Sequence, residues 1–368
     1  MRFPEFSGEW EYKSLGEIGE SLIGLTYSPS DVVKEGGTIV FRSSNIQDGV
    51  IDYGDLVRVS KKIKDSIITR DGDLLICARN GSTRLIGKNA LLKKSDEGQT
   101  FGAFMMVFRS IDNRFVHQLL STKAYSTQVS ENLGARINQI TTRNFAEYTF
   151  GMPQTSEEKE KIGTFLELIN DRIETQSKII EEQETFLKSL ADKLFLQNNH
   201  SCQLSEIVNI VKGKQLNADT LSETGDYYVM NGGITPSGYY SEYNVPAGAI
   251  SISEGGNSCG YVQFNEKPFW SGGHCYSLQC RTNLVDYKYI YYYLKTKEAD
   301  VMALRIGSGL PNIQKKDIEK FTISYPSLQL QKQFVKALDA LSGKINTEKN
   351  LLEKYCQQKS YLLSQMFI

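Results

Sequence analysis

The stretch SEEKEKIGTFLELINDRIETQSKIIEEQETFLKSLADKLFLQ, residues 156–197, decides the fold. Its apolar residues recur at alternating steps of four and three, which is the heptad spacing of a coiled-coil seam. Ser156 offers a capping oxygen at the start, and at about 1.5 Å per residue the helix would be roughly 60 Å long. A helix of that length predicts a spacer. The seam comprises Ile162, Leu166, Ile169, Ile173, Gln176, Ile180, Gln183, Leu187, Leu190 and Leu194.

The same seam returns 172 residues later, which indicates an internal duplication. Matches continue upstream, at an offset of 173 just before the helices and of 189 near the start of each half. Each half is therefore expected to be a globular unit followed by a long helix. The second seam comprises Phe334, Leu338, Leu341, Ile345, Glu348, Leu352, Tyr355, Lys359, Leu362 and Met366. The upstream matches pair Gly134, Ile140 and Pro153 with Gly307, Ile313 and Pro326, and Leu15 and Gly24 with Leu204 and Gly213.

Composition supports two globular cores and excludes several classes of protein. The chain has 368 residues, of which 40% are hydrophobic and 11% aromatic. It has no apolar run near 18 residues, so we expect no membrane insertion. The six cysteines lack the spacing of a disulfide framework and are expected to be reduced thiols. These features predict a soluble, cytoplasmic protein.

Charge is balanced overall but differs between the two predicted helices. The net charge of −1 argues against a simple electrostatic nucleic-acid binder. Residues 151–199 hold six Lys and Arg against ten Asp and Glu, whereas residues 327–368 hold six against three. Complementary charge favours an antiparallel pairing in which one chain closes on itself. Two alternatives are that each charged face is only solvated, or that it contacts a partner protein.

Each half combines short strands with a following helix. In the first half, strands are predicted at 37–42, 72–78 and 104–109 and a helix at 112–126. In the second half, strands are predicted at 226–230, 249–253, 260–264 and 275–279 and a helix at 286–297. Five tyrosines in that last helix suit a base-stacking platform, but helical spacing favours packing in the core.

We therefore predict an α+β fold class with two mixed α/β domains, each followed by a long helix, and with the helices paired as an antiparallel coiled coil. The pseudo-two-fold duplication gives domains at 1–150 and 200–326 and spacer helices at 151–199 and 327–368.

Polar loops directly after strands are the candidate binding elements. Arg can bridge two acceptors of guanine, Asn can pair with adenine, and glycine allows close approach to phosphate. The alternative for each residue is ordinary turn chemistry. The candidates in the first half are Arg42, Ser43, Ser44, Asn45, Arg79, Asn80, Ser82 and Arg84, with Arg143 just before the long helix. The candidates in the second half are Lys212, Lys214, Asn231, Asn257, Ser258 and His274, with Lys315 before its helix.

Catalytic and cofactor motifs are missing from the sequence. It has no Walker loop, no Gly-x-Gly cofactor loop, no Asn/Asp-Pro-Pro-aromatic tetrapeptide and no convincing nuclease triplet. We therefore expect no catalytic residues and no cofactor bound by this chain. Cys259, His274, Cys275 and Cys280 suggest zinc, but neighbours on a strand point to opposite faces, which argues against a metal site.

The chain resembles the specificity subunits of Type I restriction-modification systems over essentially its whole length. The resemblance rests on two globular units with trailing helices, on the tetrapeptides LPNI at 310–313 and INQI at 137–140, and on RFPEF at 2–6 with Trp10. The runs GGNSCGYV at 255–262 and FWSGGH at 269–274 are similar to one class of target recognition domain.

This resemblance implies a non-catalytic reader of double-stranded DNA. Each target recognition domain would bind one half of a split, asymmetric site, while the helices set the spacing and dock two methyltransferase subunits. Motor-nuclease subunits would complete the complex, and the partners would carry S-adenosylmethionine and ATP with Mg.

Two other classes of protein remain as alternatives. A self-contained methyltransferase-nuclease would bind S-adenosylmethionine as the isolated chain. A structural coiled-coil adaptor would not shift DNA in a gel together with a methyltransferase.

Overall fold

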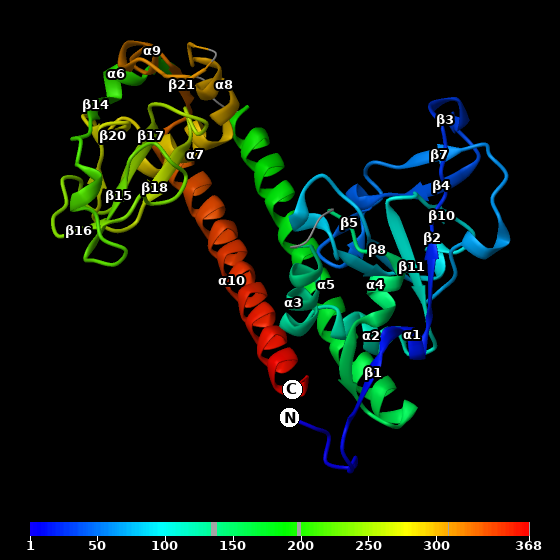
Figure 1. The fold of residues 1–368 in the computed structure, drawn as a ribbon. Helices are drawn as coiled ribbons and strands as arrows, with labels where there is room; N and C mark the ends of the chain where they lie inside the picture. Colours follow the sequence, from blue (N-terminus) through cyan, green and yellow to red (C-terminus); the bar gives the residue numbers. More distant parts are fainter. Residues whose placement is uncertain (134–137, 197–199, 308, 368) are drawn as a thin grey trace. The chain divides into compact units, whose positions relative to one another are not determined.

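The computed structural model describes residues 1–133, 138–196, 200–307 and 309–367 (Figure 1). The chain forms two compact units: unit 1 is Met1–Gln176 with Leu351–Ile368, and unit 2 is Ser177–Asn350. Gly134, Ile137 and Gln197, which the sequence analysis used, lie outside the described residues. Among the described residues, no helix is both long and apolar enough to cross a membrane.

Both long helices are present with the predicted seams. Helix α5 spans Ser156–Phe195 and helix α10 spans Leu328–Met366. All ten seam positions of each helix are buried or half-buried. The prediction of a helix at each position is therefore confirmed.

The helices pair in opposite directions within each unit. In unit 1, Ile162 and Leu166 near the start of α5 share a core with Leu362 and Met366 near the end of α10. In unit 2, Phe195 at the end of α5 shares a core with residues near the start of α10, including Phe334 and Leu338. This arrangement confirms the predicted antiparallel pairing.

An ion pair joins the two helices in unit 2. Lys349 Nζ lies 2.6 Å from Glu184 Oε1, and both side chains are about half exposed. Exposed ion pairs of this kind typically contribute about 0–1 kcal/mol. This ion pair therefore adds little to the stability that the apolar seam supplies.

The main sheets of the two units have the same topology. The main sheet has the order β2-β11-β8-β9 in unit 1 and β14-β20-β17-β18 in unit 2. Parallel pairs β4–β10 and β15–β19, and antiparallel ribbons β1–β12 and β13–β21, also correspond. The order of elements thus confirms the internal duplication.

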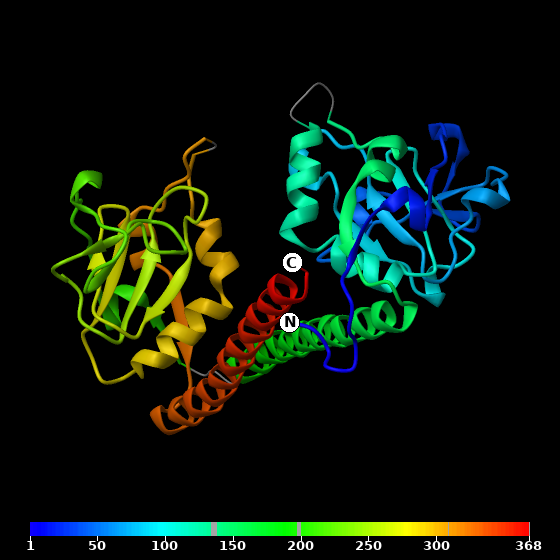
Figure 2. The same ribbon diagram turned by 60° about the horizontal axis from the view of Figure 1, so that its bottom comes forward.

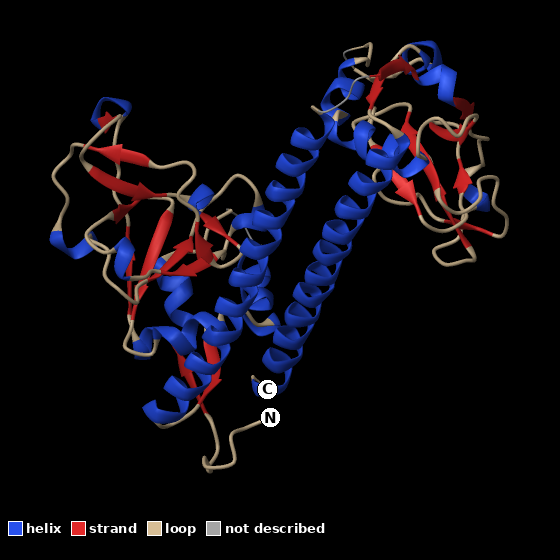
Figure 3. Cartoon of the chain, turned by 180° about the vertical axis from the view of Figure 1, so that it is seen from behind, coloured by secondary structure: helices blue, strands red, loops and turns tan. Residues whose placement is uncertain are grey.

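The strands of both units are short. Those of unit 1 are β1 Glu11–Ser14, β2 Glu20–Ile23, β3 Val32–Val33, β4 Thr38–Phe41, β5 Ile46–Gln47, β6 Val50–Ile51, β7 Val57–Val59, β8 Leu74–Cys77, β9 Asn89–Leu91, β10 Thr100–Phe101, β11 Met105–Arg109 and β12 Thr149–Met152. Those of unit 2 are β13 His200–Gln203, β14 Val208–Lys212, β15 Tyr227–Met230, β16 Tyr239–Tyr240, β17 Ala249–Ser253, β18 Val262–Asn265, β19 Trp270–Ser271, β20 Cys275–Cys280 and β21 Thr322–Tyr325. Loops between them are drawn in tan in Figure 3.

Short helices flank these sheets. They are α1 Leu15–Ile18, α2 Asn113–Leu119, α3 Lys123–Leu133 and α4 Thr142–Glu147 in unit 1, and α6 Leu204–Ile207, α7 Tyr287–Thr296, α8 Glu298–Ala303 and α9 Lys315–Glu319 in unit 2. Helix α7 packs against β18 of the main sheet (Figure 2). Tyr289 of α7 is fully buried, and Tyr292 and Tyr293 are 8% exposed. The prediction that this helix packs its tyrosines in the core is confirmed.

The single helix predicted at 112–126 is wrong, because the structure has two helices there. Helix α2 ends at Leu119, and Thr122 Oγ1 donates to its carbonyl, 2.7 Å away. The same hydroxyl oxygen accepts the backbone N–H of Tyr125 in α3 at 3.4 Å. Thr122 therefore satisfies groups at the end of one helix and the start of the next, which stabilises the break.

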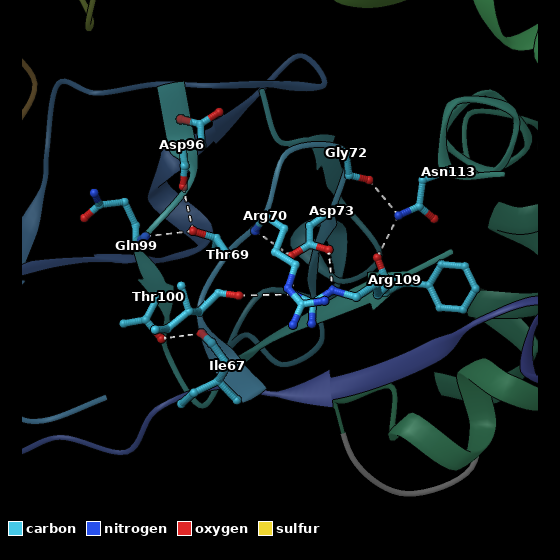
Figure 4. A network of polar contacts seen from close by, with 12 residues as sticks. Ile67, Thr69, Arg70, Gly72, Asp73, Asp96, Gln99, Thr100, Arg109 and Asn113 are labelled. Carbon is cyan, nitrogen blue, oxygen red and sulfur yellow. Dashed lines mark hydrogen bonds and ion pairs between the residues drawn. The ribbon is translucent and has the colours of Figure 1, made fainter. Parts of the chain in front are cut away.

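A polar network ties together the far ends of β8 and β11 in unit 1 (Figure 4). Asp73, just before β8, accepts two hydrogen bonds from the Arg109 guanidinium, at 2.8 and 2.7 Å. Asp73 is buried, and its hydrogen bonds raise the pKa of Arg109 further above its usual value. Asn113 donates to the carbonyls of Gly72 and Phe108, so α2 joins the same network. The network fixes the sheet at the end remote from the loops after β8.

The N-terminal segment packs on α5, which accounts for the RFPEF motif. The Arg2 guanidinium donates to both carboxylate oxygens of the buried Glu158 at 2.7 Å. Trp10 Nε1 donates to the same carboxylate at 3.3 Å, and the Phe3 ring stacks edge-on against Phe165. The motif therefore attaches the chain's first residues to the start of the long helix.

Candidate nucleic-acid interface

Three segments meet at one end of the main sheet in unit 1. The N–H of Arg79, just after β8, donates to the carbonyl of Phe104, just before β11, at 2.9 Å. The N–H of Ile140, which precedes α4, donates to the carbonyl of Ala78 at 2.7 Å. A fourth segment joins them, because the Asn80 amide donates to Ser43 Oγ at 3.0 Å. We call these segments, 42–45, 79–84, 103–104 and 138–139, the loop edge of unit 1.

A surface pocket of about 420 Å³ lies at this loop edge. It is lined by Arg79, Asn80, Gly81, Phe104 and Asn138. The Arg79 guanidinium lies 5.2 Å from the centroid of the Phe104 ring, and Phe104 is 59% exposed. An aromatic face under a guanidinium restricts its movement and leaves the N–H groups at its rim available to a ligand.

The other candidates in unit 1 have varied surroundings. Asn45 is fully buried, and its side chain bonds Arg42 N–H and the carbonyls of Asp52 and Asp55, so it stabilises its own turn. The Arg42 guanidinium pairs with Asp55 at 2.7 Å. Three further candidates are exposed: Ser82, Arg84 and, on α4, Arg143, which pairs with Glu147 at 3.0 Å. Ser44 accepts a hydrogen bond from Gln47 on its backbone carbonyl.

The backbone of unit 2 repeats the loop edge of unit 1. Here the N–H of Glu254, just after β17, donates to the carbonyl of His274, just before β20, at 2.9 Å. The N–H of Ile313 donates to the Glu254 carbonyl at 2.8 Å. In unit 1 the N–H of Ala78 donates to the carbonyl of Phe104 at 3.1 Å, so His274 stands where Phe104 stands and Glu254 stands where Ala78 stands. The loop edge of unit 2 comprises 231–233, 254–258, 272–274 and 312.

In each unit, a glycine at a matched position lets two backbone segments lie close together. A Cβ on Gly24 would lie 2.3 Å from the carbonyl oxygen of Gly102, and a Cβ on Gly213 would lie 2.2 Å from that of Gly272. Both distances are shorter than any contact that a real Cβ makes. The sequence match at an offset of 189 therefore marks the same backbone contact in both units.

A buried carboxylate distinguishes the loop edge of unit 2. Glu254 is 4% exposed, and its Oε1 accepts hydrogen bonds from Lys212 Nζ at 2.6 Å and Tyr276 OH at 2.9 Å. Burial and the bond to Glu254 raise the pKa of Tyr276. The Asn231 side chain accepts the backbone N–H of His274 at 3.1 Å. Lys212, Asn231 and His274, all candidates from the sequence, are therefore brought together.

The remaining candidates of unit 2 are less tightly connected. Asn257 and Lys214 are exposed, and Ser258 is half-buried. Lys315 begins α9 and pairs with Glu319 at 3.6 Å. Cys275 is buried in β20, whereas Cys280 is exposed and the His274 side chain is 61% exposed. Among the described residues, no group of three or more His, Cys, Asp or Glu side chains is placed to hold a metal ion.

The sequence analysis missed two residues of these loop edges, Phe104 and Glu254. Phe104 was included only as the start of a predicted strand, and Glu254 was not among the candidates. The available signal for Phe104 was an aromatic residue at the loop end of a predicted strand. The burial of Glu254 depends on Lys212 and Tyr276, which are distant in sequence, so no local signal marks it.

On the DNA-reading role that the resemblance implies, we expect Arg79→Ala to relax recognition at one position of one half-site. Loss of a guanine-bridging arginine typically costs about 1–3 kcal/mol of discrimination against the wrong base. The measurement is competition binding, by the chain co-expressed with a methyltransferase subunit, to sites carrying single base-pair changes. Lys123→Ala, which removes the same charge from the exposed start of α3, is the control. Full discrimination by Arg79→Ala at every position would contradict the assignment.

Comparison with known proteins identifies the family. The model for the Type I restriction modification DNA specificity domain matches twice, over residues 7–185 and 198–354. A putative type I specificity subunit of Mycoplasma pneumoniae is 33% identical over 152 residues, which cover 41% of this chain and 40% of that protein. One from Mycoplasma genitalium is 28% identical over 195 residues, 49% of each chain. The Escherichia coli EcoKI specificity subunit is 29% identical over 168 residues, covering 43% of this chain and 36% of that protein.

These alignments span less than half the length of each relative, whereas structural similarity extends further. The crystal structure of a Type I restriction-modification S subunit from M. genitalium has a TM-score of 0.73 at 20% identity and covers 100% of this chain and 99% of that chain. A structure from work on complex assembly of the type I system has a TM-score of 0.52 at 17% identity, with 98% of both chains covered. At such identities the likeness shows the fold alone. Because the family model covers both halves, the chain belongs to the family of Type I restriction-modification specificity subunits.

Proposed function

We propose that this chain is a non-catalytic DNA reader, in which each unit recognises one half of a bipartite, asymmetric site. The observation that carries this proposal is the duplicated loop edge. The same backbone hydrogen bonds hold Ala78 and Phe104 in unit 1 but Glu254 and His274 in unit 2. Two loop edges with similar backbones and different side chains are suited to two different base sequences.

The proposed partners are double-stranded DNA, two methyltransferase subunits and motor-nuclease subunits. The net charge of −1 is low for a protein that holds DNA alone. We therefore assign part of the phosphate contacts to the partners. They would also bind S-adenosylmethionine and ATP with Mg, and the complex would act in the cytoplasm.

The test is to exchange the recognition part of unit 1 for that of a relative. Strand β1 pairs with β12, which ends at Met152, so both strands must come from the same source and the exchange takes residues 1–152. We expect the chimera, expressed with its methyltransferase, to methylate a motif in which one half-site is new and the other is unchanged. Sequencing that detects methylated bases gives the motif.

The reciprocal exchange in unit 2 is the matched control, and it should alter only the other half-site. A chimera that changes both halves, or neither, would contradict the assignment of one half-site to each unit. A chain that shifts no DNA together with its methyltransferase would contradict the reading function itself.

A further inference from the structure

The loop edge of unit 2 holds a buried carboxylate oxygen that lacks a hydrogen bond. Both nearby donors, Lys212 Nζ and Tyr276 OH, bond Oε1 of Glu254. Oε2 of the same carboxylate is buried and has no hydrogen-bond partner among the described residues. A buried polar atom is normally paired, because it has given up its bonds to water.

His274 places a donor beside that oxygen. Its Nδ1 lies 3.5 Å from Glu254 Oε2, within reach of a hydrogen bond after a small rotation of the ring. The backbone of His274 is held at both ends, since its N–H bonds Asn231 and its carbonyl bonds Glu254 N–H. The side chain is nevertheless 61% exposed, so the rest of the ring faces outward.

We infer that Glu254 is a positioning residue that fixes the tautomer of His274. A neutral imidazole carries one proton, and a carboxylate at Nδ1 selects the tautomer with Nδ1–H. Nε2 then presents a lone pair at the loop edge. On the proposed reading function, on which this inference rests, such an acceptor pairs with an amino group in the major groove, on adenine N6 or cytosine N4.

The pairing of a carboxylate with a histidine occurs in unit 2 and not at the equivalent positions of unit 1. At the equivalent positions unit 1 has Ala78 and Phe104, which have no titratable group. Position 104 therefore offers an apolar ring where position 274 offers a hydrogen-bond acceptor. The inference predicts an effect on one half-site and none on the other.

The tautomer can be measured without DNA. The chain has three histidines, so the ¹⁵N signals of His274 are assigned by their loss in His274→Gln. Once the pH is high enough that the ¹⁵N shifts no longer change, we expect Nδ1 of His274 to show the shift of a protonated nitrogen and Nε2 that of an unprotonated one. A wild-type His274 with its proton on Nε2 overturns the inference, whatever the variants do.

Glu254→Gln should reverse the tautomer. Lys212 Nζ has only donors, so the amide oxygen is expected at the position of Oε1 and the amide NH₂ turns toward His274. Nδ1 must then accept, and the proton moves to Nε2. We expect the preference at one base pair of the second half-site to change by about tenfold, from an amino-bearing base toward a keto base, in competition binding by the complex.

The exposed Glu242→Gln makes the same charge change in the same unit and should leave the tautomer and both half-sites unchanged. A Glu254→Gln variant that reverses the tautomer and alters only the second half-site supports the inference. Unchanged base preference with a reversed tautomer overturns the reading role of His274. A wild-type complex that binds no DNA overturns the proposed function and that reading role together, even where the tautomer is as expected.

Discussion

Asp73→Ala should lower the free energy of unfolding of unit 1 by about 3–5 kcal/mol, the usual cost of breaking a buried ion pair. Asp73 has a 2% exposed side chain and holds Arg109 through two hydrogen bonds (Figure 4). Its Oδ2 also accepts the backbone N–H of Arg70 at 2.9 Å. Removing it leaves a largely buried guanidinium without its counter-charge.

Denaturant unfolding of the full chain, followed by a probe in unit 1, measures this loss. Asp71→Ala, two residues earlier and exposed, removes the same charge and should have little effect. The network lies at the opposite end of β8 from the loop edge. On the proposed function, the folded Asp73→Ala chain should therefore recognise the same DNA site as the wild type. Equal stability of the Asp73→Ala and Asp71→Ala variants would show that the ion pair contributes nothing to stability.

Acid should destabilise unit 1 through His117, by up to about 3 kcal/mol at pH 4. Burial, and secondarily the charge of Lys359, lowers the pKa of His117 from 6.5 to about 4. Between these values the unfolded chain binds a proton that the folded chain does not, so stability falls as the pH falls. Each pKa unit corresponds to about 1.4 kcal/mol. The stability is fully present above pH 6.5 and is lost as the pH drops toward 4.

The measurement is unfolding free energy against pH for the wild type and for His117→Gln. The difference between the two curves should shrink or reverse between pH 6.5 and 4, because glutamine does not titrate. Parallel curves for the wild type and His117→Gln would mean that the folded and unfolded chains bind a proton at His117 equally.

Periodicity and duplication made the framework predictable from the sequence. The heptad spacing of the seam that begins at Ile162 indicates a long helix, and α5 begins at Ser156 as expected. Strand β17 coincides with the predicted 249–253, because the short alternating sequence AISIS between turn residues is typical of a strand. Gly24 and Gly213 were found as matches, although their role became clear only from the carbonyls that they approach.

The remaining features depend on contacts between residues distant in sequence. The break between α2 and α3 depends on a single hydroxyl of Thr122, against helical propensity on both sides. Asn45 was a candidate for base reading, but it is buried and its side-chain amide donates to the carbonyls of Asp52 and Asp55 in its own turn. The pairing of Phe104 with Arg79, and of Glu254 with His274, requires that strands far apart in sequence end at the same place.

At the loop edges, the backbone supplies the hydrogen bonds that hold positions 104 and 274 in place. The side chains at these two positions are exposed and make few of the contacts that stabilise the fold. Substitutions at these two positions are therefore close to neutral for folding while they change what is presented to a ligand. Mutation and selection can explore new specificities at such sites one residue at a time, without passing through unfolded intermediates. The backbone of the loop edges therefore allows new specificities to evolve.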